Sequence, residues 1–361
     1  MKIGILTYHR SENYGAVLQA LALNKAVHSM GLNSVFVDYQ HPKHKELYKL
    51  FSWAKFKKLS AFHKLKYLLV FLLSYSRKLR RKRNFQLFFN KYFDEDSLGS
   101  IVDRYDIVIY GSDQIWRKQN ILGINGFLDI YFGSDAISAG KKISYAASMG
   151  EIRLENEDFD FLESAFSNFS AISVREDDLK ELVTKITGIV PAHVVDPVFL
   201  LDREDWKEIA SPRLLKQKYI LFYCLGVSQE ATRAVERLSR ETGLEVVELN
   251  GRIIARASRS QRWNVVGPSD FLSLLFFAEI VVTSSFHGLC FSVLFNKNFF
   301  AFPINNPRRI ESMLIGLGLE SRIIRKAEEV DLKATIDWAI VNKKMERKKE
   351  MSMDYLKKEM K

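Results

Sequence analysis

The stretch 280–288, with the sequence Ile-Val-Val-Thr-Ser-Ser-Phe-His-Gly, constrains the fold more than any other part of the chain. Its three β-branched apolar residues without alternation are typical of a strand buried on both faces of a parallel sheet. An apolar helix starts at Gly288, so His287 is predicted to lie where the strand ends and the helix begins. Open α/β sheets bind ligands at such points, and a helix N-terminus favours an anion. A histidine there can exchange a proton near neutral pH. The alternative is a histidine that caps the helix or fills a polar gap.

The same strand-to-helix pattern recurs along the chain. A strand over 2–6, a helix over 16–30 and a strand over 34–39 open the sequence, without the G-x-G-x-x-G pattern of dinucleotide-binding proteins. Further strands are predicted at 105–110, 142–150, 171–174, 219–223, 245–249, 263–266 and 298–302. This alternation predicts an α/β fold with two Rossmann-like domains facing each other across a cleft. We predict an N-terminal domain over 1–210, a C-terminal domain over 211–330 and a charged C-terminal helix over 331–361.

Polar side chains follow several of these strands. The carboxyl ends of parallel strands share one edge of a sheet, so we expect these side chains to line a cleft. Asp113 supplies a hydrogen-bond acceptor, Gln114 an amide that both donates and accepts, and Trp116 a flat apolar face on which a sugar can stack. In the alternative interpretation, Asp113 only holds its own turn, and Arg175 forms a structural ion pair with Glu176.

The net charge of +11 is concentrated in one segment. Residues 41–92 hold fifteen Lys or Arg and one acidic residue, so this segment carries +14 and the remainder −3. Its helical pattern over 55–93 places the apolar run 67–73 beside the basic run 77–83. The apolar run is shorter than the ~20 residues that span a bilayer, but the combination is typical of helices that lie on an anionic membrane surface. The alternative is a helix packed on its own domain. Nucleic-acid binding is not favoured, because no known binding module accompanies the charge.

Cysteine usage and the N-terminus point to a cytoplasmic protein. Cys224 and Cys290 lie far apart in apolar runs, which is typical of buried free thiols in a reducing compartment. The chain enters a strand directly after Met1, without the apolar core of a signal peptide. No His, Cys, Asp or Glu cluster has the spacing of a metal site, so we expect no metal and no cofactor.

Five motifs occur together in order: Asn-Tyr-Gly-Ala-Val-Leu-Gln-Ala at 13–20, Gly-Ser-Asp-Gln-Ile-Trp at 111–116, Ser-Val-Arg-Glu at 173–176, Val-Asp-Pro-Val at 195–198 and Thr-Ser-Ser-Phe-His-Gly at 283–288. In this combination the chain resembles the polysaccharide pyruvyl transferase family, over roughly residues 1 to 325. The fold of that family is similar to that of B-type glycosyltransferases. The basic segment 41–92 lies outside the motifs.

The resemblance implies transfer of pyruvate from phosphoenolpyruvate to two hydroxyls of a glycan sugar, with formation of a cyclic ketal and release of phosphate. It makes His287 the candidate general acid, Asp113 the candidate base and Arg175 the candidate cation for the phosphate or carboxylate. Asp196 is interpreted as mainly structural. The acceptor is a glycan, in one version linked to a lipid at the inner face of the membrane. Candidate substrate-binding residues are Asn13, Tyr14, Gln19, Ser112, Gln114, Trp116, Ser284, Ser285 and Gly288.

Two other functions are compatible with the same fold. One is a glycosyltransferase with a nucleotide-sugar donor, in which Glu248 would bind the donor ribose. The other is a non-catalytic module that binds glycans at a membrane surface. If Arg175 does not bind the donor, the arginines of the polar segment after 250 are the next candidates: Arg252, Arg256, Arg259 and Arg262.

Overall fold

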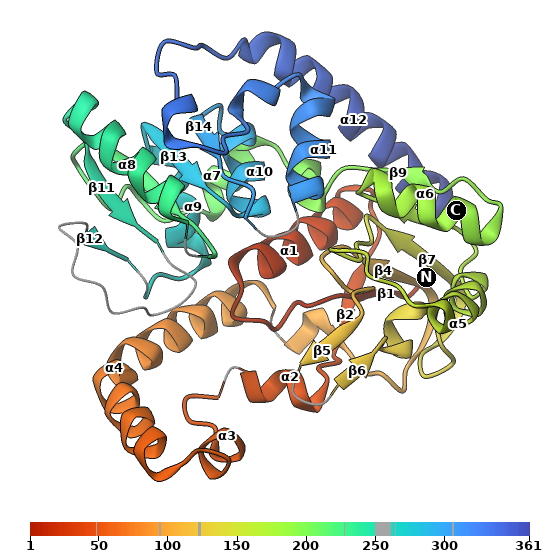
Figure 1. Cartoon of the computed structure of the whole chain (residues 1–361). Coiled ribbons are helices and arrows are strands. Elements are labelled where there is room, and N and C mark those ends of the chain that lie inside the picture. The colour runs from red at the N-terminus through yellow and green to blue at the C-terminus, as the bar shows by residue number, and fades with distance from the viewer. Residues whose placement is uncertain are drawn as a thin grey trace.

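Two parallel five-stranded sheets organise the computed structural model, which describes residues 1–47, 49–93, 95–121, 124–226, 228–249, 261–263, 265–304 and 307–361 (Figure 1). The first sheet has the order β3-β2-β1-β4-β7, and the second has the order β12-β11-β10-β13-β14. In each sheet a crossover reverses the strand order beside the first strand, as in Rossmann-like folds. The predicted architecture, two Rossmann-like domains facing across a cleft as in B-type glycosyltransferases, is therefore confirmed.

The strands of the first sheet are β1 (Ile3–Leu6), β2 (Ser34–Val37), β3 (Leu98–Gly99), β4 (Arg104–Gly111) and β7 (Ser138–Tyr145). Those of the second are β10 (Tyr219–Tyr223), β11 (Glu245–Glu248), β12 (Gln261–Arg262), β13 (Ile280–Thr283) and β14 (Asn298–Ala301). Two small pairs are added, the antiparallel β5 (Gln119–Ile121) and β6 (Ile124–Gly126), and the parallel β8 (Ser173–Val174) and β9 (Ala192–His193). The strand predicted at 263–266 is wrong, because the described residues of that range form no strand. The edge strand of the second sheet is β12, which ends at Arg262 and pairs with β11.

The helices of the first half are α1 (Tyr14–Ser29), α2 (Pro42–Leu47), α3 (Trp53–Lys57), α4 (Ala61–Tyr92), α5 (Asn156–Ser167) and α6 (Asp177–Thr187). Those of the second half are α7 (Arg203–Ile209), α8 (Gln229–Thr242), α9 (Pro268–Phe277), α10 (Phe286–Leu294), α11 (Pro307–Leu317) and α12 (Trp338–Glu359). Short 3-10 turns complete the chain: η1 (Glu95–Ser97), η2 (Asp129–Phe132), η3 (Pro197–Leu200), η4 (Glu320–Arg322) and η5 (Ala327–Glu329). No described helix combines the length and apolar character needed to cross a bilayer.

Helix α1 lies between the two sheets, which explains its unusual sequence. All of its residues except Lys25, His28 and Ser29 are buried, because it contacts α9 and α10 of the second half as well as η3 and the first sheet. A helix that is apolar on all sides requires such a buried position. One continuous apolar core includes Val17, Ile109 and Val281 and so extends through both domains.

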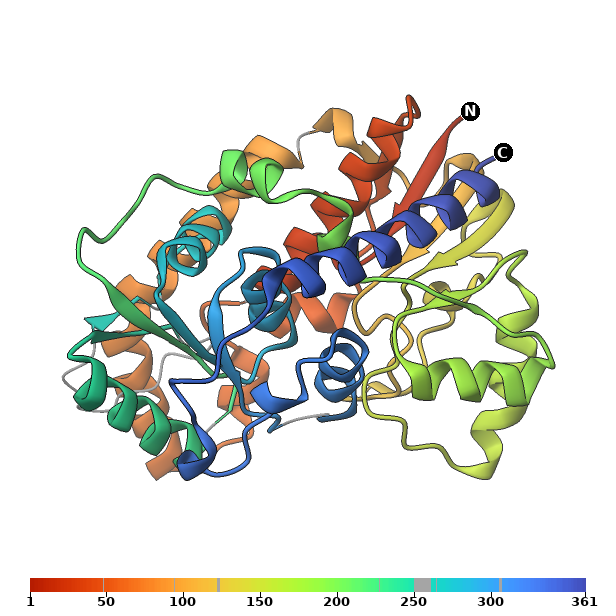
Figure 2. The same cartoon turned by 90° about the horizontal axis from the view of Figure 1, so that it is seen from above.

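The chain passes between the domains twice. The first passage lies between η3 and α7, and the second lies between η5 and α12, which returns to the first domain (Figure 2). There the hydroxyl of Tyr355 donates to the Ser144 carbonyl at 2.9 Å, and the Ser352 hydroxyl accepts from the Val195 N–H at 3.0 Å. The charged C-terminal helix is thus part of the packing of the N-terminal domain.

The basic segment follows β2 and precedes β3 in the chain, and it forms α2, α3 and α4 (Figure 1). The second half of α4 packs on the other domain, where the Asn84 side chain donates to the Val265 carbonyl at 2.6 Å. The backbone of α4 approaches Gly267 so closely that a larger residue would be crowded there. A Cβ added to Gly267 would lie 3.1 Å from the Asn84 carbonyl oxygen. The first half of α4 and α3 extend away from both domains (Figure 1).

Candidate active site

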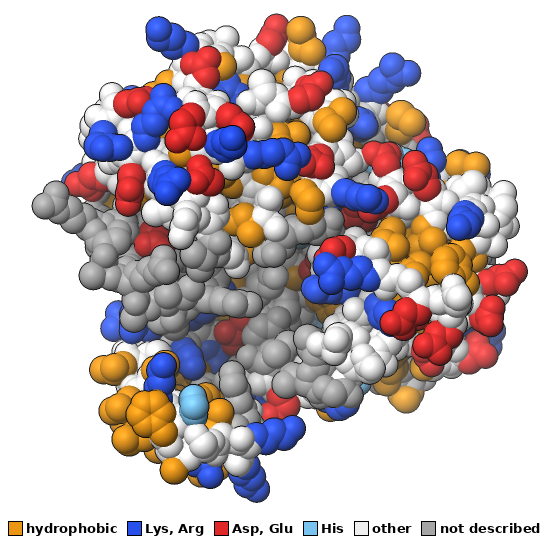
Figure 3. All heavy atoms as spheres, in the orientation of Figure 1, with side chains coloured by type: hydrophobic (Ala, Val, Ile, Leu, Met, Phe, Trp, Pro, Cys, Tyr) orange, Lys and Arg blue, Asp and Glu red, His pale blue; other side chains and the backbone are white. Residues whose placement is uncertain are grey.

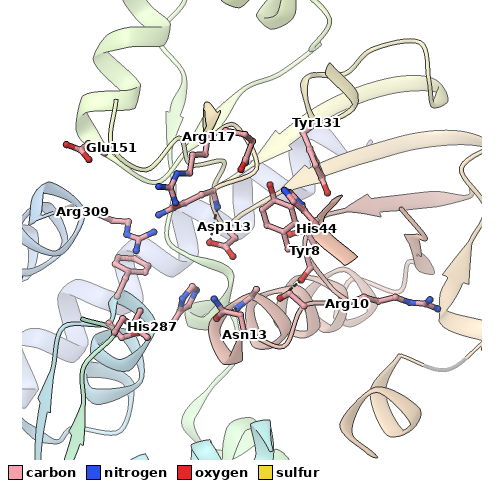
Figure 4. Close-up of a pocket in the computed structure, with 18 of the residues that line it drawn as sticks. Tyr8, Arg10, Asn13, His44, Asp113, Arg117, Tyr131, Glu151, His287 and Arg309 are labelled. Carbon is pink, nitrogen blue, oxygen red and sulfur yellow. Dashed lines mark hydrogen bonds between the residues drawn. The ribbon is translucent and has the colours of Figure 1, made fainter. Parts of the chain in front are cut away.

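A cavity of about 790 Å³ opens between the domains at the carboxyl ends of both sheets (Figure 4). Six of the predicted site residues line it: Asn13, Asp113, Gln114, Ser284, Ser285 and His287. These residues come from loops that follow β1, β4 and β13, as the alternation of strands and helices predicts. In Figure 4, the side chains of Asn13, Asp113, His287 and Arg309 converge on one part of the cavity.

His287 lies in the first turn of α10, directly after β13. The Ser285 hydroxyl caps this helix by accepting a hydrogen bond from the Gly288 N–H at 3.3 Å. The imidazole is only 8% exposed, and its Nε2 lies 3.5 Å from Oδ2 of Asp196 in the other domain. A buried carboxylate at this distance orients the ring.

Asp196, interpreted from the sequence as structural, thus has a second role. Burial alone would raise the pKa of its carboxyl, but the neighbouring charges of His287 and Arg175 hold that pKa well below its ordinary value. Its other oxygen, Oδ1, accepts from the Val198 N–H at 3.1 Å and so caps η3. The carboxylate therefore remains ionised beside His287, while the backbone of η3 fixes its position.

The backbone of α1 packs directly on the imidazole. A Cβ added to Gly15 would lie 2.0 Å from Nδ1 of His287, closer than any side chain can approach. We expect Gly15→Ala to displace the ring, to destabilise the protein by about 1–3 kcal/mol as overpacking does, and to lower any activity that depends on His287. Urea unfolding and a turnover assay measure the two effects.

The control is Gly316→Ala in α11, where an added Cβ meets nothing closer than 3.7 Å. That substitution should leave stability unchanged or raise it slightly, because alanine restricts the unfolded chain. If Gly15→Ala behaves in the same way as the control, the imidazole has room to move and its position is not critical.

Asp113 has an uncommon backbone conformation and lies opposite His287. Its φ of 61° is in the left-handed region, which most residues other than glycine, asparagine and aspartate avoid, and such positions cluster at functional sites. Its Oδ1 accepts from the Gln114 N–H at 2.9 Å, so the carboxylate does stabilise its own turn. It also lines the cavity, so both interpretations of this residue fit its placement.

Arg175 does not line this cavity, which corrects its assignment as the donor-binding cation. Its side chain is 1% exposed, and Nε donates to Oε1 of Glu176 at 2.9 Å. Its Nη1 donates to Asp196 and, at 3.3 Å, to the hydroxyl of Ser112, which is itself fully buried. The guanidinium therefore joins two carboxylates behind the cavity wall, as the structural alternative holds.

Arg309 of α11 is the cation that the sequence did not reveal. Its guanidinium carbon lies 4.6 Å from the centre of the Phe286 ring, which the Arg175 guanidinium also contacts at 4.7 Å. Burial and the charge of Arg175 lower the pKa of Arg309 below its ordinary value. Its Nε is buried without a hydrogen-bond partner, and among the described residues this side chain forms no ion pair. A half-buried guanidinium beside a cavity, with a buried Nε that lacks a hydrogen-bond partner, is well suited to bind an anion.

Three further predicted residues are buried away from the cavity. Tyr14 is 1% exposed, stacks on Phe271 with ring centres 4.6 Å apart and donates to the Val266 carbonyl at 3.0 Å. Gln19 is fully buried and donates to the Thr7 hydroxyl at 2.9 Å. Trp116 is fully buried and donates to the Tyr131 carbonyl at 2.8 Å. The predictions that these side chains contact substrate are therefore wrong, since each one fills the core.

Other aromatic rings line the cavity in place of Trp116. Tyr8 lies with its ring centre 5.8 Å from that of His44, and Tyr39 contributes a third ring from the end of β2. Gly288 is not among the residues that line the cavity, and a Cβ added to it would lie 2.6 Å from the Thr283 hydroxyl.

The residues of the remaining alternatives are placed elsewhere. Glu248 ends β11 and is not among the residues that line the cavity. Arg252, Arg256 and Arg259 lie outside the described residues, and only the backbone of Arg262 is described, in β12. No grouping of three metal-ligating side chains occurs in the described ranges.

Comparisons with solved structures find remote similarities. S. aureus MnaA bound to UDP is 12% identical, with a TM-score of 0.46, and the alignment covers 98% of this chain and 91% of that one. UDP-GlcNAc 2-epimerase from Methanocaldococcus jannaschii, in complex with UDP-GlcNAc and UDP, is 12% identical with a TM-score of 0.47, over 96% of this chain and 98% of that one. E. coli heptosyltransferase WaaC with ADP is 13% identical with a TM-score of 0.38, over 86% and 90% of the two chains. These similarities are too remote to bear on what this chain binds.

Comparison with curated proteins gives no match. The sequence model for polysaccharide pyruvyl transferase matches residues 13–306, which include β13, the first turn of α10 and the motifs that supply Asp113, Asp196 and His287. The chain belongs to the polysaccharide pyruvyl transferase family.

Proposed function

We propose that this protein transfers pyruvate from phosphoenolpyruvate to two hydroxyls of a glycan sugar and releases phosphate, in the biosynthesis of a surface polysaccharide. The observation that carries the proposal is the pairing of His287 with the ionised Asp196 at the wall of a cavity that Asp113 and Arg309 also line. This arrangement offers a proton donor, a proton acceptor and a cation to a single substrate pair. No metal and no cofactor other than the donor substrate is part of the proposal.

The chemistry assigns a step to each group. Protonated His287 delivers its proton to the methylene carbon of phosphoenolpyruvate, which becomes a methyl group, and positive charge develops at C2. The first sugar hydroxyl adds to C2 and gives its proton to Asp113. The bond from C2 to the phosphate oxygen then breaks, and the phosphate takes up the proton held by Asp113. The second hydroxyl adds to C2 to close the ketal and gives its proton to His287. One hydroxyl proton thus replaces the proton given to the methyl group, and the other ends on phosphate.

In this proposal Arg309 holds the phosphate or the carboxylate of the donor. We expect Arg309→Gln to weaken phosphoenolpyruvate binding about 10-fold to 100-fold, since a hydrogen bond to a charged group contributes about 1.5–3 kcal/mol. Isothermal titration with phosphoenolpyruvate measures this directly, without turnover.

The matched control is Arg308→Gln, one residue earlier in α11, on a side chain that is exposed and does not line the cavity. It removes the same charge and should leave the affinity unchanged. If both variants bind phosphoenolpyruvate as tightly as the unaltered protein does, Arg309 is excluded from the donor site. Equal weakening in both would indicate a general effect of charge.

The acceptor side of the proposal uses the aromatic rings of Tyr8, Tyr39 and His44, which offer apolar faces to a sugar with polar groups at their edges. We further propose that the acceptor is lipid-linked and that the enzyme works at the inner face of the cytoplasmic membrane.

Phosphate release from phosphoenolpyruvate, measured with a panel of glycan acceptors, tests the function, and the methyl signal of the ketal in the product confirms the chemistry. Thermal melting separates the alternatives. Stabilisation by phosphoenolpyruvate supports the proposal, and stabilisation by a nucleoside diphosphate supports a glycosyltransferase. If neither ligand binds and no phosphate is released with any acceptor, the protein is not this enzyme.

A further inference from the structure

One face of α4 exposes large apolar side chains to solvent. They recur at the three- to four-residue spacing of a helix, with Leu72 and Leu73 as neighbours, and are between 53% and 74% exposed: Phe62, Leu65, Leu69, Leu72 and Leu73. This spacing places them on one side of the helix, which we call the outer face of α4. Soluble proteins rarely leave a contiguous apolar surface of this kind without a partner.

The opposite side of the same helix already has its partners. The rings of Tyr67 and Phe71 pack on Phe51, with ring centres 5.2 and 5.1 Å away, and Ser74 is buried. Farther along, Phe85 and Phe88 are buried against the two domains. The outer face of α4 is therefore not needed to hold the helix in place, and its apolar residues require another explanation.

Basic residues lie on the same side of α4, after the apolar residues of the outer face. Arg80 and Arg83 lie farther along the same side of the helix, beyond Ser76 and Leu79, and both are exposed. The sequence has no Asp or Glu between Glu46 and Asp94, so no acidic residue offsets these charges within the segment. In Figure 3 this lobe, at the lower left, shows apolar side chains bordered by basic ones.

We propose that the outer face of α4 docks on an anionic lipid bilayer, with the apolar residues 62–73 in the interface and Arg80 and Arg83 at the lipid headgroups. An in-plane helix with an apolar face and a cationic end binds membranes in this way. Charge complementarity favours this occupant over a second copy of the chain, because two such faces would bring together basic segments of the same sign.

A second cavity lies between α4 and the candidate active site, which is the reason to assign the outer face of α4 to a lipid-linked acceptor. It measures about 320 Å³, lies on the inner flank of α4 and shares Arg10 and Gln40 with the main cavity. Lys45, Lys82 and the ring of Phe89 also line it. A phosphate group at the membrane surface would find cations along this route to Asp113 and His287. This part of the inference depends on the proposed function.

Vesicle sedimentation tests the docking surface. We use phosphatidylcholine vesicles with and without phosphatidylglycerol, at about 0.1 M and about 1 M salt, between which the Debye length falls from about 10 Å to about 3 Å. The full-length protein should sediment with the anionic vesicles, and less so at high salt. Leu69→Glu combined with Leu72→Glu, and separately Arg80→Gln combined with Arg83→Gln, should each reduce the bound fraction about tenfold or more.

The matched control replaces two exposed basic residues of α12, Lys343→Gln and Arg347→Gln, and should bind as the unaltered protein does. Phosphate release with a soluble glycan acceptor should be the same in all variants. Vesicle binding therefore tests the docking surface, and phosphate release independently tests the proposed function.

Three results would overturn the inference. The first is a protein that stays soluble with both kinds of vesicle. The second is an α12 variant that loses as much binding as the Arg80 and Arg83 variant. The third is an unaltered protein that is dimeric in ultracentrifugation and becomes monomeric with the Leu69 and Leu72 changes, which would make the outer face of α4 a contact between copies.

Discussion

Replacing His287 by alanine is expected to lower turnover by about 10²-fold or more while the protein remains folded, since a positioned proton donor contributes at least that much. The imidazole lies in the first turn of α10 and is paired with Asp196, but it makes no hydrogen bond on which the described packing depends. Steady-state phosphate release measures the loss, and urea unfolding shows that the fold is kept.

The control for this prediction is His63→Ala, an exposed histidine near the start of α4. It should retain the turnover of the unaltered protein with a soluble acceptor. Near-normal turnover of His287→Ala would show that the proton comes from another group, in which case His287 would serve only to balance the charge of Asp196.

Replacing Arg175 by alanine is expected to have the largest effect on stability. It would leave Glu176 and Asp196 as buried carboxylates without their shared cation. Breaking a buried ion pair in this way costs about 3–5 kcal/mol, because an uncompensated charge stays in the interior. Urea unfolding followed by circular dichroism measures the loss.

Arg233→Ala provides the comparison, since Arg233 pairs with Glu230 at 2.9 Å on the surface of α8 with its side chain 64% exposed. Surface pairs of this kind contribute about 0.2–1 kcal/mol. Arg175→Lys keeps the charge and should fold. Unchanged phosphoenolpyruvate affinity in that variant would agree with a positioning role, whereas a loss of affinity without a loss of stability would return Arg175 to the donor site.

The fold could be predicted because its signals are local. Buried parallel strands such as β4 and β13 are short continuous apolar runs, and the polar residues that follow them mark the ligand-binding edge. Prediction of an element's boundaries is less accurate where a contact between distant parts of the chain decides the local structure. At the start of α9, for example, Pro268 is the first helical residue and Gly267 is the N-cap, at a point where the backbone approaches Asn84 closely.

The site was predicted in part, and the errors share one cause. A polar or aromatic residue next to a cleft-forming turn looks the same in sequence whether its side chain points into the cavity or into the core. Asp113 and His287 point inward to the cavity, but Trp116 fills the core three residues after Asp113. Arg309 gave no signal, since it approaches Phe286 only through the packing of α11.

The two passages of the chain between the domains restrict how the cavity can open. Together with the apolar core that both domains share, the two passages favour rotation about the line that joins them over other relative motions of the domains. Asp196 stands next to the first passage and so lies near that line, whereas Asp113 and Arg309 lie on walls of the cavity. We therefore expect the mouth to widen for a bulky acceptor while the distance from Asp196 to His287 changes least, so that the imidazole stays oriented through each opening.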